Sequence, residues 1–294
     1  MTDSPDAAAS DPVGRFLQTL QLRGGEARTT EDIFVGRSEP MPSGRVFGGQ
    51  VLGQAVIAAE RTVPEGRAAH SMHGYFLRPG DATRDITFSV DRIHDGRSFS
   101  ARRTQAYQEG EPIFSMIASF QAEGAGLDHA AAMPEGVPGP DEVAPLHPSA
   151  GAQHPLSRRL LDDRPVEVRH VLPDIYLRPD AERRPTNIAW VRARRSLPDD
   201  PALHRAAIAY ISDITIQEPI MRAHGIEWVR SGLKLASLDS ALWWHRPARV
   251  DDWLLYVQES PSASGGRGLA TGRMYTRDGM LVASIAQEVV IRVP

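Results

Sequence analysis

Hydrophobic and polar positions recur along the chain in patterns that predict helices and strands. At 48–63 small apolar residues repeat at helical spacing, with Val51, Ala55 and Ala58 on one face, and Pro64 follows as a stop signal. A second helix is expected at 201–215. Strands are expected at 69–78, 86–94, 98–107, 112–121, 187–195, 233–244, 252–260, 267–276 and 280–292. One long helix against a meandering antiparallel sheet, used twice, is an α+β architecture.

The two halves of the chain are similar in sequence as well as in the order of their elements. An offset of 168 residues (275 minus 107) relates the segment 75–79 to 243–247, Tyr107 to Tyr275 and Ala118 to Ala286. Both halves also close their last hairpin with an acidic residue followed by glycine, at 109–110 and 278–279. We interpret this as one supersecondary unit used twice, the alternative being chance similarity between two β-meanders.

A change in composition separates the two units. Residues 122–165 are rich in Gly, Pro, Ala, Asp and His, so they are predicted to form a linker, within which 156–161 could make a short helix. The expected units are therefore 15–121 and 166–294, preceded by a flexible tail at 1–14.

Composition excludes several classes of protein. With 33 basic and 37 acidic residues the net charge is −4, which gives no general attraction for nucleic acid. The chain has no cysteine, so disulfides, thiolate zinc sites and cysteine nucleophiles are excluded, and a reducing, cytoplasmic location is expected. Neither a signal peptide nor a membrane-spanning segment is expected, because no long apolar run is present.

Three polar residues stand out from the pattern. Gln287 is the one polar residue on an apolar face of the strand 280–292, so it is either paired within the core or part of a polar site. Asp213 lies in the last turn of a helix, where a carboxylate opposes the helix dipole, and it is either an exposed residue or a functional one. Ser237, on a strand, is either a packing residue or a catalyst.

Other familiar signatures are missing. The segment 147–151 lacks the first glycine of a nucleophile elbow, and His70 and His73 fall on opposite faces of a strand, so they cannot share a metal ion. Gly48 and Gly49 form no nucleotide-binding loop, but their backbone N–H groups could stabilise an oxyanion, the alternative being a tight turn at the helix start. We expect neither a metal nor a cofactor.

Longer motifs carry a family resemblance. The segments 46–55, 70–81, 95–103 and 236–247, with the sequences VFGGQVLGQA, HSMHGYFLRPGD, DGRSFSARR and ASLDSALWWHRP, resemble the acyl-CoA thioesterase II (TesB-type) family. The resemblance runs from about Phe34 to Arg292. It implies a double hotdog fold, in which two fused units each wrap an antiparallel sheet around a long helix.

The resemblance also implies a catalytic set. The family's Asp, Thr or Ser, and Gln fall on Asp213, Ser237 and Gln287, which would hold a water for attack on a thioester carbonyl. Ser stands at 237 in place of the commoner Thr, and Ser240 stands where many members carry His. The expected supporting residues are Gly48 and Gly49 for the oxyanion, Arg267, Arg102 and Arg103 for the CoA phosphates, and Phe47, Tyr75, Phe76 and Trp244 for the acyl pocket.

The expected function is hydrolysis of fatty or other acyl-CoA to free acid and CoA. Two alternatives stay open, which are a hotdog enoyl-CoA hydratase or dehydratase and an acyl-CoA-binding protein without turnover. By analogy with other double hotdogs, a homodimer or homotetramer is expected.

Overall fold

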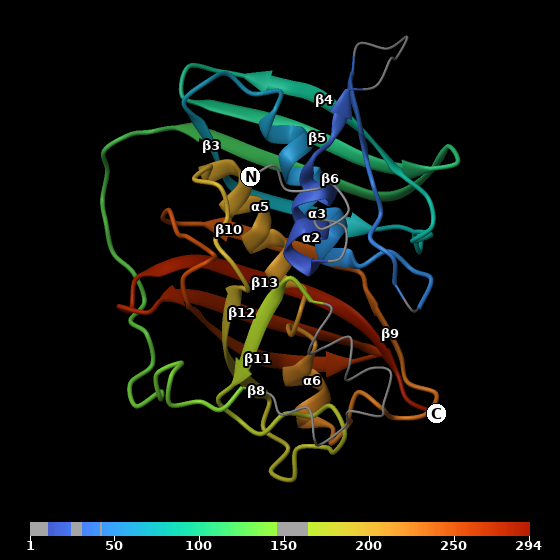
Figure 1. The fold of residues 1–294 in the computed structure, drawn as a ribbon, viewed down its shortest axis with the longest axis vertical. Helices are drawn as coiled ribbons and strands as arrows, with labels where there is room; N and C mark the ends of the chain where they lie inside the picture. The colour runs from blue at the N-terminus through green and yellow to red at the C-terminus, as the bar shows by residue number, and fades with distance from the viewer. Residues whose placement is uncertain (1–10, 25–30, 42, 146–163) are drawn as a thin grey trace, which may run out of the picture.

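The computed structural model describes residues 11–24, 31–41, 43–145 and 164–294. In this part of the chain thirteen strands form one antiparallel sheet that curves around the helices (Figure 1). The expected helix at 156–161 and most of the expected tail lie outside the described residues.

The first half begins with helix α2 (Pro12–Leu20) and the short strands β1 (Arg23–Gly24) and β2 (Asp32–Gly36). Helix α3 (Gly48–Glu60) follows. Its strands are β3 (Arg67–Phe76), β4 (Ile86–Asp95), β5 (Phe99–Gln108) and β6 (Glu111–Ala122).

The second half begins with strands β7 (Val166–His170) and β8 (Thr186–Ala193) and continues with helices α5 (Pro201–Ser212) and α6 (Glu218–Ala223). Its remaining strands are β9 (Lys234–Ser237), β10 (Asp239–Trp244), β11 (Leu254–Ser264), β12 (Arg267–Thr276) and β13 (Leu281–Arg292). The expected helices and strands are present with ends that differ by a few residues, except that two strands, β9 and β10, take the place of the one expected at 233–244.

The sheet order confirms the repeat. The first half has the strand order β2-β4-β5-β6-β3, and the second half has the matching order β8-β11-β12-β13-β10. The halves meet where β3 pairs with β10. Each half thus has the same connectivity around its own helix. At the junction His73 pairs with Ala241, 168 residues later in the chain (241 minus 73).

One detail of the predicted repeat is wrong. His73 pairs with Ile117 and Ala241 pairs with Ala286, so Ala286 corresponds to Ile117 and not to Ala118. The offset on this last strand is therefore 169 (286 minus 117). The extra residue lies in the preceding hairpin turn, since β5 ends at 108 and β6 begins at 111, whereas β12 ends at 276 and β13 begins at 281.

Helices α3 and α5 pack against each other inside the sheet. A methyl group added to Gly49 would meet the Tyr210 carbonyl oxygen, and one added to Gly53 would meet that of Ala206, so the two helices run antiparallel at very short separation. All residues of α3 from Gly49 to Ala59 are buried. A helix enclosed on all sides needs small residues wherever another backbone approaches it, which explains the composition of this segment.

The strand expected at 233–244 is in fact two strands. Ser237 pairs with Val289 in β9, whereas Ala241 pairs with Ala286 in β10, so the register changes by one residue around Leu238. The extra residue is a bulge, which redirects one strand relative to its neighbour.

Part of the predicted linker is packed against the second half. Met133, Val137 and Val143 contact a cluster that includes Trp190 on β8, and the Trp190 indole N–H donates to the Pro138 carbonyl oxygen over 2.8 Å. The linker therefore covers apolar side chains that β8, β11 and β12 turn away from the helices. No helix in the described ranges is long and apolar enough to cross a membrane.

Candidate active site

The three polar residues singled out in the sequence meet in space. Asp213 caps the C-terminal end of α5, Ser237 ends β9, and Gln287 lies within β13. Gln287 Nε2 donates to Asp213 Oδ1 over 2.6 Å and to Ser237 Oγ over 2.9 Å, and Ser237 Oγ donates to Asp213 Oδ1 over 3.3 Å. Asp213 is 4% exposed, so its interpretation as an exposed residue is wrong.

The first half of the chain contributes the N-terminal end of α3. The Gly49 N–H donates to Asp213 Oδ2 over 2.9 Å, so the positive end of a helix faces the carboxylate. A methyl group at Gly48 would stand only 2.7 Å from the same oxygen, which requires this position to lack a side chain. The site therefore lies between the two halves and needs both.

The two glycines differ in what their N–H groups can do. Gly49 donates to Asp213, whereas the Gly48 N–H donates to no group in the described chain. A free N–H in the first turn of a helix can stabilise an anion. Of the two expected oxyanion donors, only Gly48 is therefore available while Gly49 holds Asp213.

Burial sets the charge state of Asp213. Burial raises the pKa of this carboxyl to about 6. The hydrogen bonds from Gln287, the Gly49 N–H and Ser237 lower the pKa, but their effect is smaller than that of burial. An aromatic ring adds to the dry surroundings, because Phe76 lies 3.2 Å from where a methyl group on Gly48 would stand. A carboxyl that titrates close to neutral pH can accept a proton and return it.

The carboxylate retains room for a further donor. An ionised carboxylate offers about four acceptor positions, and the three groups that contact Asp213 occupy three of them. Gln287 Oε1 is buried and has no hydrogen-bond partner among the described residues. The arrangement can therefore hold a water by its two protons, one toward Asp213 and one toward Gln287. In the described part of the chain no group of His, Asp and Glu could hold a metal ion.

Asp239 stabilises the break between β9 and β10, next to Ser237. It belongs to the motif at 236–247, but the sequence alone gave it no role. Its Oδ1 accepts the Glu288 N–H over 2.8 Å, and its Oδ2 contacts His73 Nε2 over 2.8 Å. Asp239 thus ties the bulge between β9 and β10 to the residue that follows Gln287. An acidic residue two positions after a strand serine is the signal in the sequence that could have indicated this.

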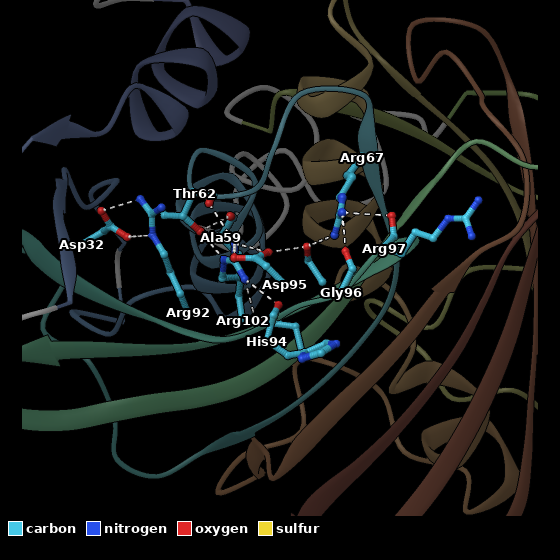
Figure 2. Close-up of polar contacts among 12 residues, drawn as sticks. Asp32, Ala59, Thr62, Arg67, Arg92, His94, Asp95, Gly96, Arg97 and Arg102 are labelled. Carbon is cyan, nitrogen blue, oxygen red and sulfur yellow. Dashed lines mark hydrogen bonds and ion pairs between the residues drawn. The ribbon is translucent and has the colours of Figure 1, made fainter.

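Arg102 belongs to an internal network and does not face the site. It is fully buried, and its guanidinium donates to Thr62 Oγ1, to the carbonyl oxygens of Thr62, His94 and Ala101, and to both carboxylate oxygens of Asp95. Figure 2 shows the guanidinium among these groups, with Arg67 joined to Asp95 through the Ser100 hydroxyl and Arg92 paired separately with Asp32. All five N–H groups of Arg102 are used within the protein, so none is left for a CoA phosphate.

The other two candidate arginines are on the surface. Arg103 pairs with Asp91 on β4 over 3.1 Å, away from Asp213. Arg267 pairs with Glu288 on β13 over 3.0 Å. Side chains alternate along a strand, so Glu288 lies on the face of β13 opposite to the buried Gln287. The structure therefore brings neither arginine to Asp213.

The four candidate aromatic residues separate into two groups. Phe47 precedes α3 and packs edge-on against Tyr210, and Phe76 lies beside Gly48, so both border the site. Tyr75 is 54% exposed on the opposite face of the sheet. Trp244 donates to the Arg205 carbonyl oxygen, near the other end of the helix pair. The structure therefore brings two of the four to Asp213.

Comparison with known proteins agrees with the fold. Residues 37–121 match the model of the acyl-CoA thioesterase N-terminal domain, and residues 163–290 match the acyl-CoA thioesterase model. The chain is 38% identical to human acyl-coenzyme A thioesterase 8, over 90% of this chain and 85% of the relative. It is 34% identical to acyl-CoA thioesterase 2 of Haemophilus influenzae, over 96% of this chain and 99% of the relative.

A solved structure shares the same architecture. The acyl-CoA thioesterase II TesB2 from Mycobacterium marinum has a TM-score of 0.75 and 38% identity, and the match covers 95% of this chain and 98% of that one. Two helices wrapped by one continuous sheet define a double hotdog fold. The chain belongs to the acyl-CoA thioesterase family, which confirms the predicted enzyme class.

Proposed function

We propose that Asp213, Ser237 and Gln287 hold the water that hydrolyses the acyl-CoA thioester. The observation that carries the proposal is the buried Asp213 carboxylate, held by donors from both halves while one of its acceptor positions stays open. The unpaired Gln287 Oε1 supports it, because a buried acceptor without a partner is costly unless it serves a ligand.

The reaction follows from this placement. The water oxygen attacks the thioester carbonyl carbon, and its proton passes to Asp213. The carbonyl oxygen becomes an oxyanion, which the Gly48 N–H stabilises at the positive end of α3. Collapse of this intermediate breaks the carbon–sulfur bond, and Asp213 returns the proton to the departing CoA thiolate. The products are a free acid and CoA, without a covalent acyl-enzyme.

Phe47 and Phe76 are the residues we propose to line the entrance of the acyl chain. Both lie at the start of α3, next to the position of the reacting carbonyl. Their rings also exclude water from Asp213, which strengthens the electrostatic interactions inside the site.

The proposal is tested by following the release of free CoA thiol from acyl-CoA esters of several chain lengths. Asp213→Asn and Gln287→Ala are expected to lower kcat by on the order of 100-fold or more, because each removes a group that acts on the water. Asp252→Asn, at a carboxylate in a separate surface cavity, is the matched control and is expected to retain wild-type activity.

Two results would contradict this assignment. Acyl-CoA binding without thiol release at any chain length would make the protein a binding module. Formation of an enoyl-CoA from a 3-hydroxyacyl-CoA, with the thioester intact, would make it a dehydratase.

We further propose that the chain forms a homodimer or homotetramer and acts in the cytoplasm. Tyr75, Ile117 and Trp243 are 54%, 55% and 43% exposed on β3, β6 and β10, strands that are neighbours in the sheet. Large apolar side chains gathered on one face favour association. Sedimentation equilibrium tests the assembly, and cell fractionation tests the location.

A further inference from the structure

Strand β11 contacts the segment of chain that carries Asp213. Helix α5 ends at Ser212 and helix α6 begins at Glu218, so Asp213 opens the short turn between them. All residues at 212–216 are buried. The donors described above hold only the carboxylate oxygens of Asp213, so other groups must set the position of its backbone.

Tyr256 on β11 holds the residue that precedes Asp213. Its hydroxyl donates to the Ser212 carbonyl oxygen over 2.9 Å, and its side chain is fully buried. The last carbonyl groups of a helix have no partner within the helix, so this bond satisfies one of them in the core. Gly272 on β12 makes room for the tyrosine, because a methyl group there would stand 2.5 Å from the ring.

Gln258 lies two residues further along β11 and holds the chain after Asp213. Side chains two positions apart on a strand share a face. The Gln258 amide contacts Thr215 Oγ1 over 2.9 Å, and with its oxygen toward Thr215 it also accepts the Ile216 N–H over 3.2 Å. Tyr256 and Gln258 therefore hold the backbone on either side of Asp213.

Asn187 on β8 supports Gln258 in turn. The two residues are cross-strand partners, and their amide groups lie 2.7 Å apart. Both side chains are fully buried, as is that of Thr215. Such a network resists displacement, because breaking any of its bonds leaves a buried polar group unpaired. Strand β11 lies between β8 and β12, so the network stands on a strand that is paired on both sides.

The Tyr256 hydroxyl also affects the charge of Asp213. A carbonyl oxygen at the C-terminal end of a helix carries partial negative charge, which opposes a neighbouring carboxylate, and the donated proton offsets that charge at Ser212. Burial raises the pKa of Tyr256 and the charge of Asp213 raises it further, so the hydroxyl stays a donor at neutral pH. Besides burial and the donors already described, the Arg164 charge lowers the pKa of Asp213.

We propose that Tyr256 and Gln258 are positioning residues for hydrolysis, which hold the turn at Ser212 and Thr215 so that the Asp213 carboxylate stays directed at the water. They act through this turn and not on the substrate. The inference rests on the proposed function, because it takes Asp213 as the base.

The first test is Tyr256→Phe, which removes the hydroxyl and keeps the ring. We expect kcat with an acyl-CoA ester to fall about 10-fold and KM to stay within about twofold, because the base is displaced while the groups that meet the substrate remain. The acid limb of the profile of kcat/KM against pH should move up by about half a pH unit, the size of one weak hydrogen bond, because the Ser212 carbonyl is then unpaired beside Asp213.

The matched control is Tyr275→Phe. Tyr275 is a buried tyrosine on β12 that packs in the cluster with Trp190, on the face of the sheet turned away from the helices. This variant loses the same hydroxyl group from a buried ring. It is expected to leave kcat, KM and the pH profile unchanged.

The second test is a pair of variants at Thr215. Thr215→Val removes the hydroxyl that Gln258 holds and keeps the volume, and it is expected to lower kcat about 10-fold. Thr215→Ser keeps the hydroxyl and loses a methyl group, and its kcat should stay within about twofold of the wild type. A residue that only fills the core would give the opposite order, because valine leaves no cavity there. Thermal unfolding measures the stability of each variant.

The possible failures can be told apart. Wild-type kinetics in Tyr256→Phe or in Thr215→Val would overturn the role of the residue concerned while hydrolysis itself continues. Equal losses in Tyr256→Phe and Tyr275→Phe, or a higher kcat in Thr215→Val than in Thr215→Ser, would assign the effect to core packing and overturn the positioning role. Full activity of Asp213→Asn would overturn the proposed function, and the positioning role with it.

Discussion

At the scale of single residues, Asp213 is under two opposing influences. Burial favours its protonated form, and three donated hydrogen bonds favour its charged form. Burial is the larger influence, so the carboxyl titrates far above its usual range and close to the pH at which the enzyme must work. The same burial lowers the stability of the folded protein when Asp213 is ionised, because water solvates the charge better in the unfolded chain.

The first prediction concerns activity against pH. A pKa of about 6 for Asp213 predicts that kcat/KM is constant above about pH 7 and falls tenfold per pH unit below about pH 5, because only the ionised carboxylate accepts the proton. Initial rates with one acyl-CoA ester across pH 4 to 9 measure this directly. A profile that stays flat down to pH 4.5 would show that Asp213 is not the base.

The second prediction concerns stability against pH. The folded-state pKa of Asp213 lies above its unfolded value, so the folded protein binds the proton more tightly, and stability falls as pH rises from about 4 to about 6. Asp213→Asn removes this cost and is expected to unfold at a higher temperature than the wild type at pH 8, by the equivalent of up to about 3 kcal/mol, since the pKa shift is about two units. The difference should vanish at pH 4, and calorimetric melting at the two pH values tests it.

The third prediction uses the contact between Gly48 and Asp213. Gly48→Ala would place a methyl group 2.7 Å from Asp213 Oδ2, so the carboxylate must move. We expect kcat/KM to fall by on the order of 100-fold, since small displacements of catalytic groups are costly. Gly24→Ala is the control, because a methyl group there meets nothing within 4 Å. Full activity of Gly48→Ala would mean that this oxygen is not part of the reaction.

At the scale of helices and strands, the sequence predicts the elements with strong periodicity and misses the short ones. The helices at 48–63 and 201–215 were expected and are present as α3 and α5. The elements α2, β1, β2, β7 and α6 were not expected, because short segments carry too few residues for a period to be recognised. The break at Leu238 was missed because the segment was treated as one strand with one alternation, whereas the bulge reverses it: Ser237 faces Asp213 before the bulge, and Ser240 and Leu242 are the fully buried residues after it.

Part of the candidate site could be predicted from the alternation of polar and apolar positions. Gln287 and Asp213 are polar residues at positions where the pattern is apolar, so each can be recognised alone. Their meeting depends on how two elements pack, and the contact of Gly49 with Asp213 joins residues far apart in the chain. Such contacts leave no local pattern, and only the family resemblance related the residues to one another.

The fourth prediction concerns Asp239, which stabilises the break between β9 and β10. Asp239→Ala removes the acceptor of the Glu288 N–H and is expected to lower kcat about 10-fold, because Ser237 and Gln287 are then held less firmly. Asp239→Asn keeps a side-chain oxygen for that N–H and should retain most of the activity. The test measures kcat for both variants and the wild type at equal concentrations of folded protein. Equal activity in all three proteins would show that the contact has no role in positioning.

At the scale of the whole molecule, the repeat generates a second position equivalent to the site, and that position is not equipped for the reaction. The strand registers relate Gln287 to Ala118 and Ser237 to Ala69, neither of which can hold a water. The carboxylate at the corresponding end of α3 is Glu60, which pairs with Arg205 over 2.6 Å. Duplication therefore provides two scaffolds and one candidate site.

The fifth prediction follows from this asymmetry between the halves. Burial raises the pKa of Glu60 as it does that of Asp213, but the paired Arg205 guanidinium takes the position that a water would need. Glu60→Gln is expected to lower the free energy of unfolding by about 1–3 kcal/mol through loss of a buried ion pair and to leave kcat within about twofold of the wild type. Isothermal calorimetry with a non-hydrolysable acyl-CoA thioether should then give one bound ligand per chain. Two ligands per chain, or loss of turnover in a Glu60→Gln protein that melts normally, would mean that both halves carry a working site.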